Sequence, residues 1–213
     1  MDSQNQTNAL DWIELANTSI AVLVAIIGAI GLYNLVIARR TLRVNSKRDA
    51  FRLSAERCEH YLNHIIPLLN ELDKVIEKNG IKTFKEAKVV INGDGIKVSN
   101  IVMGQEIDLL KKIDNEFLAA MNAIESFSTY FISGVADEAI AYKTVGTTFL
   151  ASTKRLAPEF LYLCSSGYYQ NTKDLMLLWG QRFEKQRIAV ERAKLEEEGE
   201  KIKEKHIKPI GTL

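Results

Sequence analysis

Hydrophobic and polar residues follow three different patterns along the chain. From Leu15 to Ala38 no charged residue occurs, and a helix that rises 1.5 Å per residue crosses a hydrocarbon core of roughly 30 Å with about 20 residues. From Phe51 to Ile76 apolar residues recur every three or four positions, as they do in an amphipathic helix. Beyond Phe183 the chain is mostly lysine, arginine and glutamate. The patterns predict a mainly all-α protein, with one transmembrane helix that continues into a cytoplasmic helical bundle.

Turn and helix-breaking residues divide the rest of the chain. We expect a stalk helix that is kinked near Pro67 and ends at Lys78-Asn79-Gly80. The β-branched residues on both sides of Asn92-Gly93-Asp94-Gly95 predict a small β-hairpin or ordered loop near 88–98. The predicted segments are a short extracytoplasmic N-terminus (1–14), the transmembrane helix (15–38), the stalk helix (39–80), the hairpin or loop (81–102), a cytoplasmic helical domain with a charged C-terminal helix (103–206) and a tail (207–213).

Helical periodicity resumes in the second half of the chain, from about residue 104. Gly134 should end the first of these helices, and Asp137 is a suitable N-cap for the next. We expect Pro158 to kink or split that second helix. The last helix should run from about Asn171 to about Lys205.

The last predicted helix carries half of a coiled-coil pattern. Ile188, Leu195 and Ile202 recur every seven residues without a second apolar series. This pattern is compatible with a solvated helix and with packing against a neighbouring subunit.

Charge on the two sides of the uncharged stretch predicts its orientation. Residues 1–16 contain no lysine or arginine, whereas five basic residues occur between 39 and 48. Positive flanks stay in the cytoplasm, so the N-terminus should face outside and the C-terminal domain should be cytoplasmic. The net charge of the whole chain is only +1, which argues against a purely electrostatic nucleic-acid partner.

Small residues gather on one face of the predicted span. Such residues let helix backbones approach closely within lipid, so we expect this face to mediate homo-oligomerisation while the larger residues of the opposite face contact the bilayer. The predicted interface residues are Ala21, Ala25, Gly28, Ala29 and Leu32. If a ring of spans surrounds a pore, its mouths should carry Asn17, Arg39, Arg40 and Arg43.

Sequence patterns for known catalytic and cofactor sites are absent, and we expect no cofactor and no metal. His60 and His64 stand at the i, i+4 spacing of metal ligands but lack a convincing third ligand. Arg57 and His64 have the R-x6-H spacing of HEPN ribonucleases, and seven residues of α-helix turn through about 700°, which places both on one face. They are weak catalytic candidates, because such spacings arise readily by chance in helical proteins.

Two segments, AAMNAIESFSTYFISGVADEAIAY and DLMLLWGQRFEKQRIA, resemble a bacterial family of single-pass membrane proteins of unknown function. The central motif of that family is matched here by Asn122, Glu125, Gly134, Asp137 and Glu138. The architecture also resembles the accessory membrane-pore proteins of type VI-B CRISPR systems, which carry a degenerate HEPN-like motif. This resemblance implies a bacterial inner-membrane protein that acts in anti-phage defence, with an RNA-guided effector protein or RNA as its trigger.

Three functions are therefore open. The first is a homo-oligomeric effector that forms a pore or depolarises the membrane. The second is a membrane-tethered HEPN-like ribonuclease, and the third is a passive membrane anchor for a cytoplasmic partner. The absence of a complete catalytic constellation favours a protein that is not an enzyme.

Overall fold

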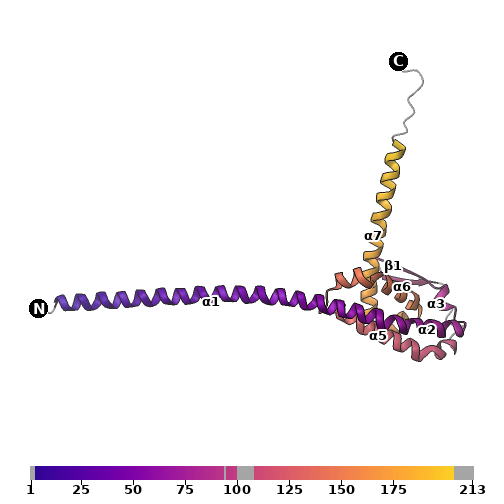
Figure 1. Cartoon of the computed structure of the whole chain (residues 1–213), viewed down its shortest axis with the longest axis horizontal. Helices are drawn as coiled ribbons and strands as arrows, with labels where there is room; N and C mark the ends of the chain where they lie inside the picture. Colours follow the sequence, from indigo (N-terminus) through magenta and orange to yellow (C-terminus); the bar gives the residue numbers. More distant parts are fainter. Residues whose placement is uncertain (1–2, 94, 100–107, 204–213) are drawn as a thin grey trace, which may run out of the picture. The chain divides into compact units, whose positions relative to one another are not determined.

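A computed structural model describes the backbone of residues 3–93, 95–99 and 108–203, and the side chains of 23–24, 26–93, 95–99 and 108–200. The described chain is mainly helical (Figure 1), which confirms the predicted fold class at this level. It divides into two compact units, Met1–Asp49 and Ala50–Leu213. The first unit consists of the larger part of helix α1 (Ser3–His60), and all other elements belong to the second.

The segment predicted as a kinked stalk contains a π-helical turn, η1 (Tyr61–Ile65), directly before α2 (Ile66–Lys78). Pro67 is the second residue of α2 and follows η1 closely; because α1, η1 and α2 are continuous, its missing N–H leaves the preceding turn without one helical donor. The irregularity therefore precedes the proline. The predicted end of this segment is confirmed, since α2 stops at Lys78.

The predicted hairpin is present and small. After the short helix α3 (Thr83–Glu86), strands β1 (Lys88–Asn92) and β2 (Gly95–Ser99) pair antiparallel, with Val90 opposite Lys97. One face of β1 is covered, because Ile91 is buried and β1 packs against the helix α7 (Gln170–Lys203).

Three longer helices complete the domain (Figure 1). The 3-10 turn η2 (Lys111–Ile113) leads into α5 (Asp114–Ile132), and α6 (Glu138–Cys164) precedes α7. Of the two predicted effects of Pro158, a kink or a split, the split does not occur, because α6 continues through the proline. Leu156, Ala157 and Phe160 around the proline are all buried, and their packing offsets the loss of one backbone hydrogen bond.

The core of the second unit is aromatic. Tyr61, Phe127, Phe149 and Trp179 come from η1, α5, α6 and α7 and have at most 3% exposure. Ring centroids are 4.8 Å apart for Tyr61 and Phe127 and also for Phe149 and Trp179. Each of the four elements thus contributes at least one large ring to a single cluster, which fixes how they pack together.

Helix α7 changes character along its length. Its first half packs against α5, α6 and β1, and at Gly180 the side chain of Ile91 lies so close that a Cβ atom there would overlap it. From Lys185 to Glu198 every residue is exposed. The side chain of Ile202, the last residue of the seven-residue series, lies outside the described part.

Candidate functional site

The described part of the uncharged stretch is helical and uncovered within its own unit. Large apolar residues on every side of the helix are exposed, from 44% for Ile37 to 68% for Leu32. Gly28 has no neighbouring atom within 4 Å of a Cβ position, and Ala29 is exposed as well. The described residues of both the predicted lipid face and the predicted contact face are therefore accessible within this unit.

Some predicted residues of this stretch cannot be placed. The side chains of Asn17, Ala21 and Ala25 lie outside the described residues. Within the described residues, no helix combines the length and the apolar character that a membrane crossing requires.

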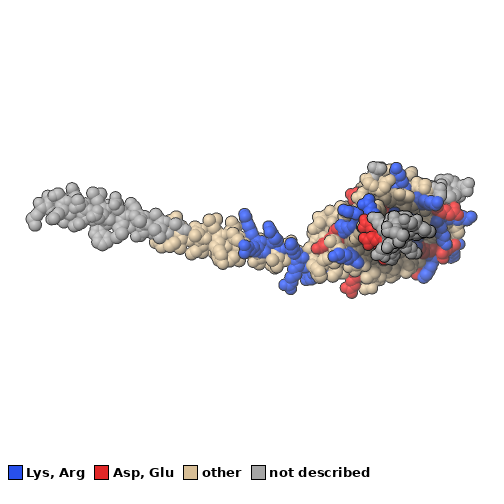
Figure 2. All heavy atoms as spheres, turned by 90° about the horizontal axis from the view of Figure 1, so that it is seen from above, with Lys and Arg blue, Asp and Glu red and all other residues tan. Residues whose placement is uncertain are grey.

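A run of basic residues follows the apolar stretch on α1. Arg39, Arg40 and Arg43 are all exposed, and Figure 2 shows lysine and arginine side chains gathered along the helix directly after uncharged surface. The change from apolar to basic surface occurs within one helical turn after Ala38.

One residue of the predicted ribonuclease pair, His64, lies within the π-turn. Arg57 is half-buried, with its guanidinium 4.4 Å from the ring centre of Tyr130 and 2.8 Å from a carboxylate oxygen of Glu56. His64 is exposed and stacks on His60, with ring centroids 4.6 Å apart. Arg57 lies in the α-helical part before this turn and His64 lies within it, so their spacing includes residues with i→i+5 hydrogen bonding.

Asn122 and Glu125, two residues of the motif that carries the family resemblance, accept hydrogen bonds that connect α5 to the beginning of α7. Glu125 Oε1 accepts hydrogen bonds from the backbone N (3.2 Å) and Nδ2 (2.9 Å) of Asn171. Glu125 Oε2 accepts from the backbone N (2.8 Å) and Oγ1 (2.7 Å) of Thr172. Asn122 accepts a longer bond, 3.4 Å, from the Tyr169 hydroxyl. A carboxylate that binds free N–H groups at a helix N-terminus also interacts favourably with the helix dipole.

Gly134 and Asp137 form the turn between α5 and α6. Gly134 has φ +73°, a conformation that is favourable for glycine. Asp137 Oδ1 accepts from the backbone N of Ile140 at 3.1 Å, which confirms the predicted N-cap. The carbonyl of Asp137 accepts from the Ser54 hydroxyl at 3.0 Å, so the same residue also holds α1.

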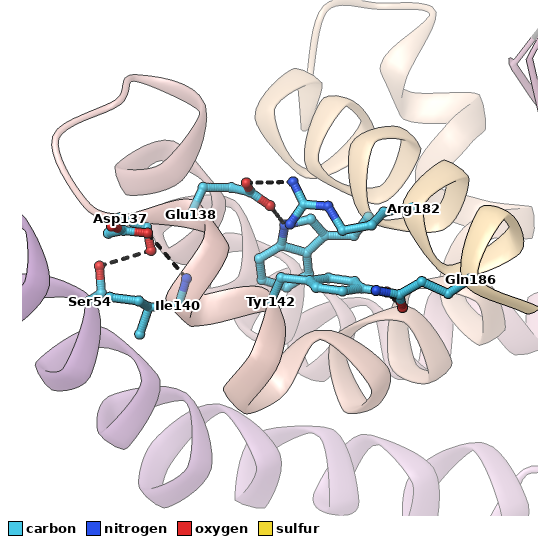
Figure 3. A network of polar contacts seen from close by, with 8 residues as sticks. Ser54, Asp137, Glu138, Ile140, Tyr142, Arg182 and Gln186 are labelled. Atoms are coloured by element: carbon cyan, nitrogen blue, oxygen red, sulfur yellow. Dashed lines mark hydrogen bonds and ion pairs between the residues drawn. The ribbon is translucent and has the colours of Figure 1, made fainter. Parts of the chain in front are cut away.

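Glu138 is the centre of a polar network between α6 and α7 (Figure 3). Its carboxylate accepts hydrogen bonds from the Trp179 indole N–H and, at 2.8 Å, from Arg182. The guanidinium of Arg182 lies 4.7 Å from the ring centre of Tyr142, and the Tyr142 hydroxyl donates to Gln186 at 2.9 Å. The network couples a buried indole to the exposed half of α7. Sequence reasoning found Glu138 but not its partners, because these lie more than 40 residues away.

Burial raises the pKa of several groups in the second unit. It raises the pKa of Tyr61 to about 12, and Ser152 and Arg155 offset part of the effect. The Tyr61 hydroxyl has no hydrogen bond of normal geometry, and burial therefore dominates the shift of its pKa. The pKa of Glu159 is raised by burial and then by Asp114.

The two cysteines are free and do not form a reactive site. Cys58 is buried and Cys164 is half-buried. Desolvation by burial raises both of their pKa values, which lowers the thiolate fraction and makes them poor nucleophiles. Within the described residues no group of three or more histidine, cysteine or acidic side chains is placed to hold a metal ion.

A groove of about 880 Å³ lies beside the hairpin and the outer half of α7. Ile91, Asn92 and Gly93 form one wall. The other wall is a face of α7, and it includes Ile188, Ala189, Arg192, Ala193 and Glu196. Sequence analysis identified the partial heptad pattern here but not the groove, because its hairpin wall comes from a distant segment.

No family model matches the chain, and comparisons with curated proteins and with solved structures give no match.

Proposed function

We propose that the chain is a single-span membrane protein that assembles as a homo-oligomer and changes the permeability of the membrane. The observation that carries the proposal is the uncharged stretch from Leu15 to Ala38, followed directly by Arg39, Arg40 and Arg43. The stretch begins at Leu15, which is eight residues before Leu23, the first residue whose side chain the structure describes. Its described apolar residues have no partner within their own unit that covers them, and a bilayer would remove this surface from water.

The basic residues after the stretch support a cytoplasmic location for the second unit. Arginine and lysine side chains at a helix end extend toward the lipid headgroups while their apolar stems stay near the bilayer. We also propose that the chain lies in the bacterial inner membrane and acts in anti-phage defence, with an RNA-guided effector or RNA as its trigger. This part of the proposal is based on the resemblance alone.

Self-association follows from the small face of the stretch. Gly28 and Ala29 leave space for a second backbone, and small residues one helical turn apart permit close helix contact in lipid. One span offers no continuous path for ions, so conduction requires several copies. Stacked rings of Arg39, Arg40 and Arg43 would then disfavour small cations at the inner mouth.

The ribonuclease alternative has less support from the described geometry. Arg57 faces Tyr130 and Glu56, whereas His64 is exposed beside His60. A general base and a phosphate-binding cation need to converge on one substrate. A passive anchor would share the membrane placement but would not need the small face.

The proposal is tested by the size of the full-length particle in mild detergent after extraction from washed membranes. We expect the wild-type chain to resist alkaline extraction and to form a homo-oligomer, and Gly28→Leu to reduce its size because a bulky side chain separates the helices. Ile27→Leu, on the opposite face, is the matched control and should leave the size unchanged. Release of the protein by alkaline carbonate would refute the membrane placement. An equal response of both variants would refute the assigned interface.

A further inference from the structure

The helix face that includes Gly28 continues into basic residues beyond the apolar stretch. Each residue of an α-helix turns through about 100°, so positions three or four apart lie on one face. Helix α1 is α-helical throughout this part of the chain. One row of residues along it consists of Gly28, Leu32, Leu35, Arg39, Arg43 and Lys47. Three basic residues therefore lie on the same face as the proposed helix contact.

The three basic residues of this row have no acidic partner in the described part of the chain. Arg39, Arg43 and Lys47 are exposed, and none of them forms an ion pair with another described residue. The sequence contains no aspartate or glutamate between Glu14 and Asp49. On the face seen in Figure 2, lysine and arginine side chains project from this part of α1. The row thus presents positive charge that no described residue neutralises.

Contact through the small face would bring these like charges together. Packed helices have axes about 8–10 Å apart, which is close to the Debye length of about 8 Å at physiological ionic strength. Basic residues of adjacent copies at the same level of the membrane therefore repel each other with only partial screening. The same face favours contact within the apolar stretch and opposes it at the cytoplasmic end. A negatively charged group between the copies resolves this conflict.

We propose that headgroups of anionic phospholipids in the cytoplasmic leaflet lie between the basic rows of neighbouring copies and are required for assembly. This inference rests on the membrane span and the small-face contact of the proposed function. Arg39 and Arg43 bind phosphate oxygens through paired hydrogen bonds, and Lys47 adds a positive charge. Because one headgroup contacts two copies only when the copies are adjacent, anionic lipid stabilises the oligomer relative to the single chain.

The position of the row favours a lipid headgroup over a dissolved anion. Arg39 directly follows the uncharged stretch, so in the proposed span it lies at the level of the lipid phosphates, which arginine side chains at a helix end reach. Anionic headgroups have a high local density there. Each basic residue near such a surface strengthens binding about fivefold.

Reconstitution of the full-length protein in lipid vesicles tests the proposal. Copies that carry a donor or an acceptor fluorescent protein after Leu213 report their association by energy transfer. The association constant should be about tenfold higher in phosphatidylcholine vesicles with about one third phosphatidylglycerol than in phosphatidylcholine alone. Equal association in the two membranes would overturn the lipid requirement.

Two glutamine variants test which face of α1 binds the lipid. Arg43→Gln should associate more strongly than the wild type in phosphatidylcholine, because it removes repulsion, and its response to phosphatidylglycerol should fall to about twofold. Arg48→Gln is the matched control, since Arg48 is also exposed but lies on the opposite face, and it should keep the tenfold response. An equal response of the two variants would overturn the assigned face.

Dissolved anions separate the lipid headgroup from other sources of phosphate. Inorganic phosphate or a short single-stranded RNA, added to phosphatidylcholine vesicles, should leave association of the wild type unchanged. Restoration of association by either anion would overturn the assignment to a lipid.

Gly28→Leu distinguishes failure of this inference from failure of the proposed function. If the wild type and Gly28→Leu associate equally weakly in both membranes, the small-face contact is refuted and this inference is refuted with it. If the wild type associates more strongly than Gly28→Leu, but equally in both membranes, the contact stands and only the lipid requirement is overturned.

Discussion

Glu125 connects the beginning of α7 to α5, and its replacement by alanine should destabilise the second unit strongly. The carboxylate accepts four hydrogen bonds, from Asn171 and Thr172, over 2.7–3.2 Å. Two of the donors are backbone N–H groups at the helix N-terminus, and Thr172 is fully buried. Without the carboxylate, water has poor access to these donors.

The size of the effect follows from the kind of bonds that are lost. A hydrogen bond to a charged group contributes about 1.5–3 kcal/mol, and loss of an N-terminal cap costs about 0.5–2 kcal/mol. The four bonds share one carboxylate and are not additive, so we expect a loss of about 3 kcal/mol for Glu125→Ala. In a unit of this size that corresponds to a decrease in Tm of about 6–12 °C.

Thermal unfolding of the full-length protein, followed by circular dichroism at neutral pH, measures this loss. Glu125→Gln keeps the shape of the side chain, but its amide NH₂ group would face the N–H and O–H donors that the second carboxylate oxygen now accepts from. We expect it to lose about half of the unfolding free energy that Glu125→Ala loses. Glu116→Ala, at an exposed position of the same helix, is the control and should change stability by less than about 0.5 kcal/mol. If Glu125→Ala and Glu116→Ala lower the Tm equally, the capping role is refuted.

Three further changes test other parts of the account. Tyr61→Phe should leave stability within about 1 kcal/mol at neutral pH, because the ring contacts remain. The pKa of Tyr61 in the folded protein, about 12, exceeds the ordinary value of 10, so between pH 10 and pH 12 the unfolded chain loses a proton that the folded chain keeps. The free energy of unfolding of the wild type should therefore fall over this range by up to about 1.4 kcal/mol per pH unit. Denaturant titrations should show that Tyr61→Phe removes this part of the decline, and an identical decline in both proteins would contradict the buried phenol. Gly134→Ala should cost about 1–2 kcal/mol, because φ is +73° there, whereas Gly199→Ala in the exposed helix should not destabilise. A periplasmic reporter fused after Leu213 should be inactive and a cytoplasmic one active, and the reverse would overturn the proposed orientation.

Local signals predicted the elements whose cause is local. Four predicted features depend on residues within a few positions of the feature itself. They are the end of α2 at Lys78, the turn at Gly134, the N-cap at Asp137 and the hairpin of β1 and β2. Such features follow from backbone preferences and capping, which a sequence displays directly.

Features that depend on distant contacts were missed or mistaken. The sequence around Pro158 indicates a break, but the packing that keeps α6 continuous comes from other elements. The π-helical form of the turn before Pro67, which includes His64, was not predicted from the sequence. Glu138 was singled out as part of a motif, but its contacts with Trp179 and Arg182 required the fold.

The central claim is that the chain acts on the membrane as an oligomer and does not cleave RNA. The most direct measurement is the membrane potential of cells that express the full-length chain together with its proposed trigger, recorded along with the integrity of total RNA. The account predicts depolarisation with intact RNA for the wild type and for His64→Ala, and a normal potential for Gly28→Leu. A normal potential in the wild type, with RNA fragmentation that disappears in His64→Ala, would contradict it.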